Sequence, residues 1–171
     1  MKFIKSISTS IFTLLLCTAC ESDLEQVTYS SENAIPSTLS SLNDSYILES
    51  KNASQEAFTL TWSYPDLGYQ ASVINALEMD VKDKNFANKV ILASSKTDLS
   101  HTITVSDLNS KIMTLLKVYE METAPIGIEF RISSSISAAA DTLYSNIVST
   151  TITPYAVSYT HLRAHETCAD L

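Results

Sequence analysis

The clearest pattern along the chain is a strict alternation of apolar and polar residues in two runs. Phe58, Leu60 and Trp62 alternate with threonine and serine, which is the period of a half-buried strand. The same period from Ile126 to Ile132 predicts a second strand with one inward face. Because Trp62 shares the phase of Phe58 and Leu60, we expect its ring in the core rather than on the surface.

Five further strands are predicted from shorter apolar runs between turn residues. They cover Tyr46–Leu48, Ala71–Val81, Lys89–Ser94, Thr102–Val105 and Tyr144–Thr153. On the second of these, Glu78 and Asp80 fall out of phase with the apolar residues, so we expect them on a solvated face. Residues 133–141 are small and polar and predict a loop.

One helix is predicted between the strands that cover residues 102–105 and 126–132. Ser106 is expected to be its N-cap, and Asp107 suits the first turn. Apolar residues follow at helical spacing: Leu108, Ile112, Leu115 and Leu116. Many short strands with one short helix predict an all-β fold, an immunoglobulin- or fibronectin type III-like β-sandwich.

The N-terminus has the pattern of an export signal. Lys2 and Lys5 precede an apolar stretch, residues 7–16, that is too short to cross a bilayer as a helix. Small residues then precede Cys20, the arrangement that a bacterial lipoprotein signal peptidase cleaves, although Cys17 stands where leucine is usual. We predict residues 1–19 to be a lipoprotein signal peptide and Cys20 to be the lipidated first residue. The alternatives are an ordinary cleaved secretory signal and a core cysteine.

Composition restricts the function of the mature chain. Loss of Lys2 and Lys5 lowers the net charge from −8 to −10, which argues against nucleic acid as a partner. Membrane attachment must then come from the lipid. Two glycines exclude a glycine-rich phosphate loop, and Cys168 alone provides no disulfide framework. We expect a flexible tether over 20–45, one domain over 46–155, and a tail over 156–171.

The sequence offers weak candidates for chemistry. His101 is interpreted as a surface strand residue, and Glu78 with Asp80 is the one carboxylate pair considered for glycosidic cleavage. A small sandwich is not expected to provide the cleft such a pair needs, so we expect no enzyme and no cofactor. Tyr64, Tyr69 and Tyr155 lie near turns and are the better candidates for exposed aromatic contacts.

The C-terminal tail differs from the rest of the chain. Residues 157–167 resemble the translation of a sequencing adapter, so we exclude them from the fold and expect the natural protein to be longer. His161, His165 and Cys168 have a spacing that would suit zinc. Without a fourth ligand, we expect no metal there.

Several segments, in order, resemble the N-terminal domain of SusE-type outer-membrane lipoproteins, the SusE/SusF family. They are Phe58–Tyr64, Gly68–Ala71, Asp107–Asn109, Ile128–Ile132, Tyr144–Asn146 and Thr153–Tyr155. The resemblance extends over about residues 20–155. It implies a lipid-anchored protein on the cell surface of Bacteroidetes, with Glu21, Ser22 and Asp23 as the signal for surface export.

In that family, further β-sandwich domains bind starch-like glycans. The resemblance therefore implies that this domain is a non-catalytic spacer and docking module, and no sugar-contacting residue can be assigned. Its implied partners are a SusC-like transporter and a SusD-like lipoprotein, with polysaccharide bound through the downstream domains. The alternative is a structural or adhesion module that binds another protein and has no part in glycan uptake.

Overall fold

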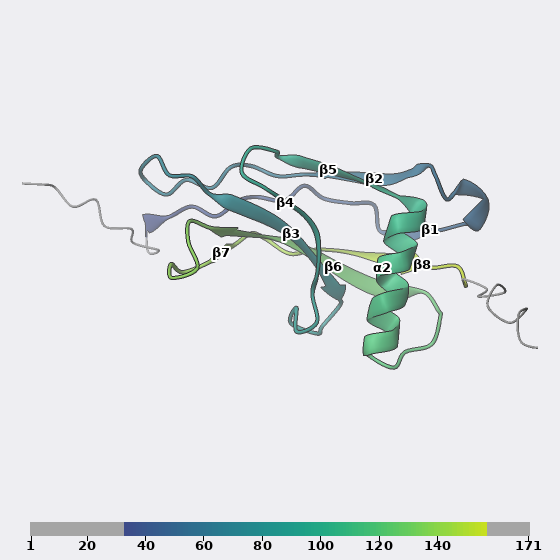
Figure 1. Cartoon of the computed structure of the whole chain (residues 1–171). Coiled ribbons are helices and arrows are strands. Elements are labelled where there is room, and N and C mark those ends of the chain that lie inside the picture. The colour runs from purple at the N-terminus through teal and green to yellow at the C-terminus, as the bar shows by residue number, and fades with distance from the viewer. Residues whose placement is uncertain (1–32, 157–171) are drawn as a thin grey trace, which may run out of the picture.

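Two layers of β-strands and one α-helix make up residues 33–156, the part of the chain that the computed structural model describes (Figure 1). The elements in chain order are β1 (Ser45–Ile47), the 3-10 turn η3 (Ser50–Asn52), β2 (Glu56–Thr61), β3 (Ile74–Val81), β4 (Val90–Ser95), β5 (Ser100–Thr104), α2 (Val105–Val118), β6 (Ile126–Ser135), β7 (Leu143–Tyr144) and β8 (Val148–Thr153).

The strand order is that of an immunoglobulin-like sandwich. The larger sheet has the order β1-β8-β6-β3-β4, with β7 paired to β6, and the smaller sheet pairs β2 with β5. Neighbouring strands are antiparallel except β1 and β8, which run parallel. α2 connects β5 of one sheet to β6 of the other. The predicted all-β sandwich with one short helix is confirmed.

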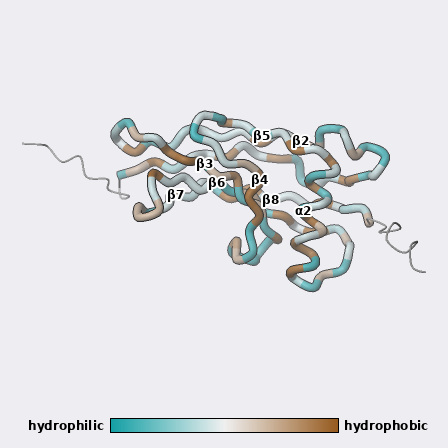
Figure 2. Tube along the Cα trace, in the orientation of Figure 1, coloured by the Kyte–Doolittle hydropathy of each residue, from teal (hydrophilic) through white to brown (hydrophobic). Residues whose placement is uncertain are grey.

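The core lies between the two sheets and is built by the alternation seen in the sequence. Figure 2 shows apolar positions interspersed with polar ones along the same strands. Phe58 of β2 meets Phe130 of β6 edge-to-face, with ring centroids 5.7 Å apart, and this contact joins the sheets. Trp62 is 6% exposed, which confirms its predicted place in the core.

Helix α2 begins two residues earlier than the predicted N-cap allows. Thr104 is extended, and its hydroxyl accepts a hydrogen bond from the Asp107 amide at 3.3 Å, so Thr104 and not Ser106 is the N-cap. Ser106 already belongs to the first turn. The predicted apolar stripe is confirmed as the buried face, together with Val105 and Asn109.

Two predicted boundaries in the last third of the domain are wrong. β6 continues to Ser135 because Ser134 is buried, where its hydroxyl donates to Asn75 at 2.7 Å. The single strand expected over 144–153 is two strands, β7 and β8. Between them, the Ser145 hydroxyl accepts the Ile132 amide at 2.8 Å, and this side-chain bond interrupts the strand.

The tether prediction is wrong over residues 33–45. Ile35 pairs with Asp66, and Leu39 pairs with Trp62, so this segment adds to the edge of the smaller sheet beside β2. Leu39 is buried because it supplies an apolar side chain to the core cluster. Residues 20–32 lie outside the described part of the chain.

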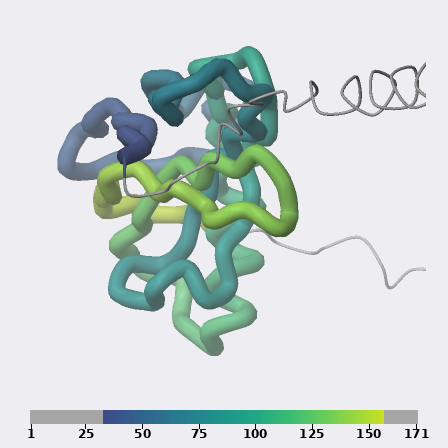
Figure 3. The backbone as a smooth tube through the Cα atoms, turned by 90° about the vertical axis from the view of Figure 1, so that its left-hand side faces the viewer, coloured from purple at the N-terminus to yellow at the C-terminus, as the bar shows by residue number. Residues whose placement is uncertain are grey.

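The described segment begins and ends at opposite ends of the sandwich. Residue 33 lies at one end of the long axis and residue 156 at the other (Figure 1). Figure 3 views the sandwich along that axis, from the end where residue 33 lies. The chain therefore runs through the domain from one end to the other.

An asparagine side chain holds each of the two terminal segments. Asn146 bonds both the amide and the carbonyl of Leu39, at 2.8 and 3.1 Å. Asn109 does the same for Tyr155, at 2.9 and 3.1 Å. In each case two hydrogen bonds from one asparagine side chain fix the direction of the backbone in that segment.

Candidate functional site

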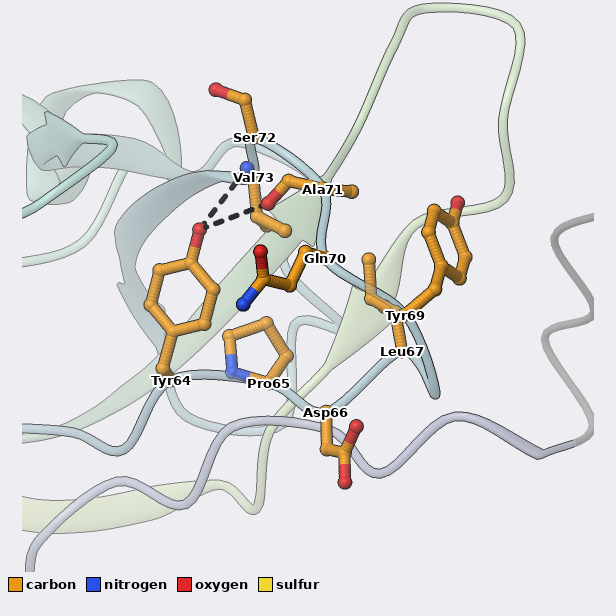
Figure 4. A pocket seen from close by; sticks show the side chains of 9 residues that line it. All are labelled: Tyr64, Pro65, Asp66, Leu67, Tyr69, Gln70, Ala71, Ser72 and Val73. Atoms are coloured by element: carbon orange, nitrogen blue, oxygen red, sulfur yellow. Dashed lines mark hydrogen bonds between the residues drawn. The ribbon is translucent and has the colours of Figure 1, made fainter. Parts of the chain in front are cut away.

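An open depression of about 570 Å³ lies in the loop between β2 and β3. Figure 4 shows the side chains that line it, which are Tyr64, Pro65, Asp66, Leu67, Tyr69, Gln70, Ala71, Ser72 and Val73. The sequence placed two candidate aromatic residues near this turn, and the fold brings both into the same depression.

Local hydrogen bonds fix the shape of this loop. The Tyr64 hydroxyl accepts a bond from the Val73 amide at 3.2 Å and lies 3.5 Å from the Ala71 carbonyl (Figure 4). Asp66 accepts the Gly68 amide at 2.8 Å, and Gly68 has a φ of 74°, a conformation that suits glycine. The Tyr64 hydroxyl and the Asp66 carboxylate thus stabilise the turn, while Tyr64 as a whole residue stays 43% exposed.

Tyr155 does not join the other two tyrosines. It follows β8, beside α2, where its backbone is held by Asn109. Its ring is half-buried against the core cluster. The depression therefore contains only two of the three predicted aromatic candidates.

The carboxylates predicted on a solvated face are buried, so that prediction is wrong. Glu78 is 1% exposed and Asp80 is fully buried. Asp80 accepts the amides of Val81 and Asn88 at 2.7 and 3.1 Å and the Tyr119 hydroxyl at 3.0 Å. The loop between β3 and β4 folds back over this face of the sheet, because Asp80 and its partners hold it there.

Glu78 lies between two cations. Lys89 and Arg131 both form ion pairs with it, and Arg131 Nε is 2.8 Å from Glu78 Oε2. Burial alone would raise the pKa of Glu78, but hydrogen bonds from Lys89, Arg131 and Ser133 outweigh burial and hold the pKa below its ordinary value. Glu78 is therefore a fully partnered structural anion.

Two aromatic rings enclose the guanidinium of Arg131. Its central carbon lies 4.0 Å from the ring centroid of Phe86 and 3.9 Å from that of Tyr144. Phe86 has a φ of 56°, an uncommon backbone conformation for a bulky residue, and the contact with Arg131 accompanies it. Sequence reasoning missed this cluster, because only the register that sets Glu78 opposite Arg131 reveals it.

His101 is on a strand, as predicted, but its surface assignment is wrong. It pairs with Leu60 across β5 and β2, and Leu60 faces the core, so the imidazole lies on the inner side. The ring is half-buried, and His101 Nε2 is enclosed without a hydrogen-bond partner. No nucleophile or carboxylate contacts it at that atom.

The remaining predicted sites lie outside the described residues. They are the lipidation site Cys20, the acidic residues Glu21 and Asp23 with Ser22, and the tail residues His161, His165 and Cys168. Within residues 33–156, histidine, cysteine, aspartate and glutamate form no group of three that could hold a metal ion. Over the same range, no helix is both long enough and apolar enough to cross a membrane.

The fold and these features define a class: an immunoglobulin-like sandwich with an open tyrosine-lined depression and a structural charge cluster on its outer face. The chain belongs to the SusE outer membrane protein family, whose model matches residues 22–133, more than half of the chain. It is thus an outer-membrane protein of the glycan-utilisation systems of Bacteroidetes. No curated protein and no solved structure matches it.

Proposed function

We propose that this chain is a lipid-anchored surface protein of a starch-like glycan-utilisation system, and that its sandwich is a non-catalytic spacer and docking domain. The lipid would be attached at Cys20. Partners of the domain would be a SusC-like transporter and a SusD-like lipoprotein, while polysaccharide would be bound by domains further along the natural protein.

The observation that carries this proposal is the position of the two terminal segments. They leave from opposite ends of the sandwich (Figure 1), and Asn146 and Asn109 bond these segments to the domain at Leu39 and Tyr155. A domain that only had to bind a ligand would not need its ends held apart. A spacer needs its two ends held apart, because the length of the domain then separates the next part of the protein from the membrane.

The free edge of β4 supports a docking role. β4 ends the larger sheet, and its sequence from Val90 to Ser95 contains no charge, proline or glycine. An uncharged edge strand of this kind can accept a strand from a partner through backbone hydrogen bonds. Ile91 is 54% exposed on this strand and would contact such a partner.

A non-catalytic role is supported by the state of the candidate acid and base groups. Glu78 and Asp80 are enclosed and fully bonded, so neither carboxylate is free to reach a glycosidic oxygen. In the depression, the Tyr64 hydroxyl bonds the backbone of its own turn, at Val73 and Ala71.

Affinity electrophoresis in gels that contain starch or another polysaccharide tests the proposal. We expect the chain from Cys20 onward to migrate at the same rate with and without polysaccharide. Retardation would contradict the spacer assignment, and Tyr64→Ala with Tyr69→Ala would then show whether the depression is the cause. A natural full-length protein without any retardation would contradict the glycan role as a whole.

A further inference from the structure

Two polar side-chain atoms at one end of the core are enclosed, and no residue of the described chain bonds them. They are Nδ2 of Asn75, near the start of β3, and Nε1 of Trp62, the residue after β2. Asn75 is fully buried and Trp62 is nearly so. Because an enclosed polar group without a hydrogen bond is unfavourable, these two atoms point to a ligand inside the domain.

A chain of hydroxyl groups crosses the core to the same asparagine. Ser37, in the segment before β1, has its hydroxyl oxygen 3.2 Å from that of Ser134 on β6. The Ser134 hydroxyl donates to Asn75 Oδ1 at 2.7 Å. All three residues are buried, so these bonds link the segment before β1 to the larger sheet through the interior of the sandwich.

The single proton of each hydroxyl sets the direction of this chain. Ser134 uses its proton on Asn75, so Ser37 is the donor in the bond to Ser134. The Ser37 oxygen therefore keeps lone pairs that can accept, while the Asn75 amide keeps its N–H donors. The indole nitrogen of Trp62 is a donor only. Donors on Asn75 and Trp62 and an acceptor on Ser37 are thus unused.

Strand pairing brings Trp62 next to these hydroxyl groups. Leu39 pairs with Trp62, so Ser37, two residues before Leu39, is diagonal to Trp62 on the same inner face. Diagonal neighbours on a sheet are about 7 Å apart, within the reach of an indole ring. Across the core, Ser37 bonds Ser134, which pairs with Asn75. We call Ser37, Trp62, Asn75 and Ser134 the polar seam.

Tyr64 closes the polar seam on the side of the depression. It has the same phase as Trp62, and its hydroxyl reaches the other sheet, where it accepts the Val73 amide at 3.2 Å (Figure 4). Val73 is buried, two residues before Asn75. Since Tyr64 and Val73 also line the depression, the polar seam lies directly behind it.

We propose that the polar seam holds one internal water molecule between Asn75, Trp62 and Ser37. This water accepts hydrogen bonds from Asn75 Nδ2 and Trp62 Nε1 and donates one to Ser37 Oγ. A buried water usually makes about three hydrogen bonds. It completes a polar bridge that ties the segment before β1 to the larger sheet.

The chemistry of the polar seam fits water better than an ion. Its unused groups include N–H donors on Asn75 and Trp62, which repel a metal cation. None of its four residues is charged, so the polar seam itself has no positive charge to balance an anion. Water can accept and donate at once, and the combination of two donors with one acceptor oxygen requires both.

The test uses NMR on the isotope-labelled chain from Cys20 onward. Trp62 is the only tryptophan, so it gives one indole N–H signal. Water-selective NOE and ROE experiments distinguish a long-lived water from one at the surface by the relative sign of the two effects. We expect the long-lived sign at the Trp62 indole and at the Asn75 side-chain amide. The exposed Gln70 side-chain amide is the matched control and should show only surface water.

A second measurement counts internal waters through oxygen-17 relaxation dispersion of the solvent, to which hydroxyl protons do not contribute. Asn75→Leu keeps the branched shape of the side chain but replaces the amide with methyl groups, so the count should fall by one. Thr150→Val is the control, because Thr150 is buried but bonds the Asn43 carbonyl directly, at 2.7 Å. Its count should equal that of the unsubstituted chain.

The absence of a long-lived water NOE at Trp62 and Asn75 would overturn the proposal. An NOE at only one of them would also overturn it, since one shared water contacts both. An unchanged water count in folded Asn75→Leu would contradict it as well. If Asn75→Leu does not fold, the NOE measurement on the unsubstituted chain decides alone.

Discussion

Arg131 of β6 lies directly opposite Glu78 of β3 and donates a hydrogen bond to its carboxylate at 2.8 Å. This pair is on the outer face of the larger sheet, yet it is almost fully enclosed. Phe86, from the loop after β3, and Tyr144 of β7 both lie against the guanidinium. The charge pair thus holds a loop and a short strand onto a face that would otherwise meet solvent.

Replacement of Arg131 should destabilise the domain strongly. In Arg131→Met, Glu78 keeps only Lys89 as a charged partner, and the rings of Phe86 and Tyr144 lose the cation between them. Breaking a buried pair in this way costs about 3 kcal/mol. Urea denaturation measures the loss, and Arg131→Lys is the control that keeps the charge but not the planar fork. A loss below about 1 kcal/mol in Arg131→Met would show that the cluster is not structural.

Stability should fall in acid through Glu78. Its pKa in the folded chain is below the ordinary 4.5, because the bonds from Lys89 and Arg131 outweigh the effect of burial. The ionised form is then favoured by folding, so this stabilisation is complete above pH 4.5 and is lost as the pH falls through the folded-state pKa.

Glu78→Gln isolates this effect. The difference in unfolding free energy between the unsubstituted chain and Glu78→Gln should be largest near neutral pH and should shrink below pH 4.5. Chemical denaturation at a series of pH values measures both curves. A difference that stays constant down to pH 3 would contradict a lowered pKa.

The N-cap of α2 provides a prediction that separates two neighbouring hydroxyls. Thr104→Ala removes the side chain that accepts the Asp107 amide and should cost about 1 kcal/mol. Ser106→Ala removes the N-cap predicted from the sequence, and it should lower the stability of the domain clearly less than Thr104→Ala does. Thermal denaturation of both variants compares them; equal losses would mean that Thr104 has no special capping role.

Asn109 should control the exit of the chain from the domain. Its side chain is fully buried and bonds both polar groups of the Tyr155 backbone. In Asn109→Ala, the Tyr155 amide loses its acceptor and should exchange with deuterated water at least tenfold faster. Asn146→Ala is the matched variant for the segment before β1 and should affect Leu39 instead. If the Tyr155 amide exchanges at an unchanged rate in Asn109→Ala, the argument that the exit segment is rigidly held is contradicted.

Alternation in the sequence was enough to predict the sandwich, its core strands and the buried face of α2. Phe58, Leu60 and Trp62 all lie where their period places them, because one face of β2 meets the opposite sheet. The alternation of apolar and polar residues could not show that the outer face of β3 is also buried, under the loop between β3 and β4. Glu78 and Asp80 look like solvated residues until the strand register and the returning loop bring partners to them.

The same limit applies to the segment before β1. Its composition is that of a solvated linker, but Leu39 is buried and Ile35 pairs with Asp66. Apolar residues as sparse as Ile35 and Leu39 show no strand alternation in the sequence, so only tertiary contacts reveal the strand pairing. Two of the candidate tyrosines were placed near the right turn by proline and glycine, whereas nothing local indicated that Tyr155 would be fixed by Asn109.

The most direct test of the central claim is the state of Cys20 in cells. We predict that mass spectrometry of the protein from outer membranes finds a diacylglycerol-modified Cys20 as its first residue, and that external protease reaches the domain in intact cells. Cys20→Ser should leave the signal peptide uncleaved by the lipoprotein peptidase and remove the protein from the surface. An unmodified Cys20 in protein that still reaches the surface would contradict the anchored spacer.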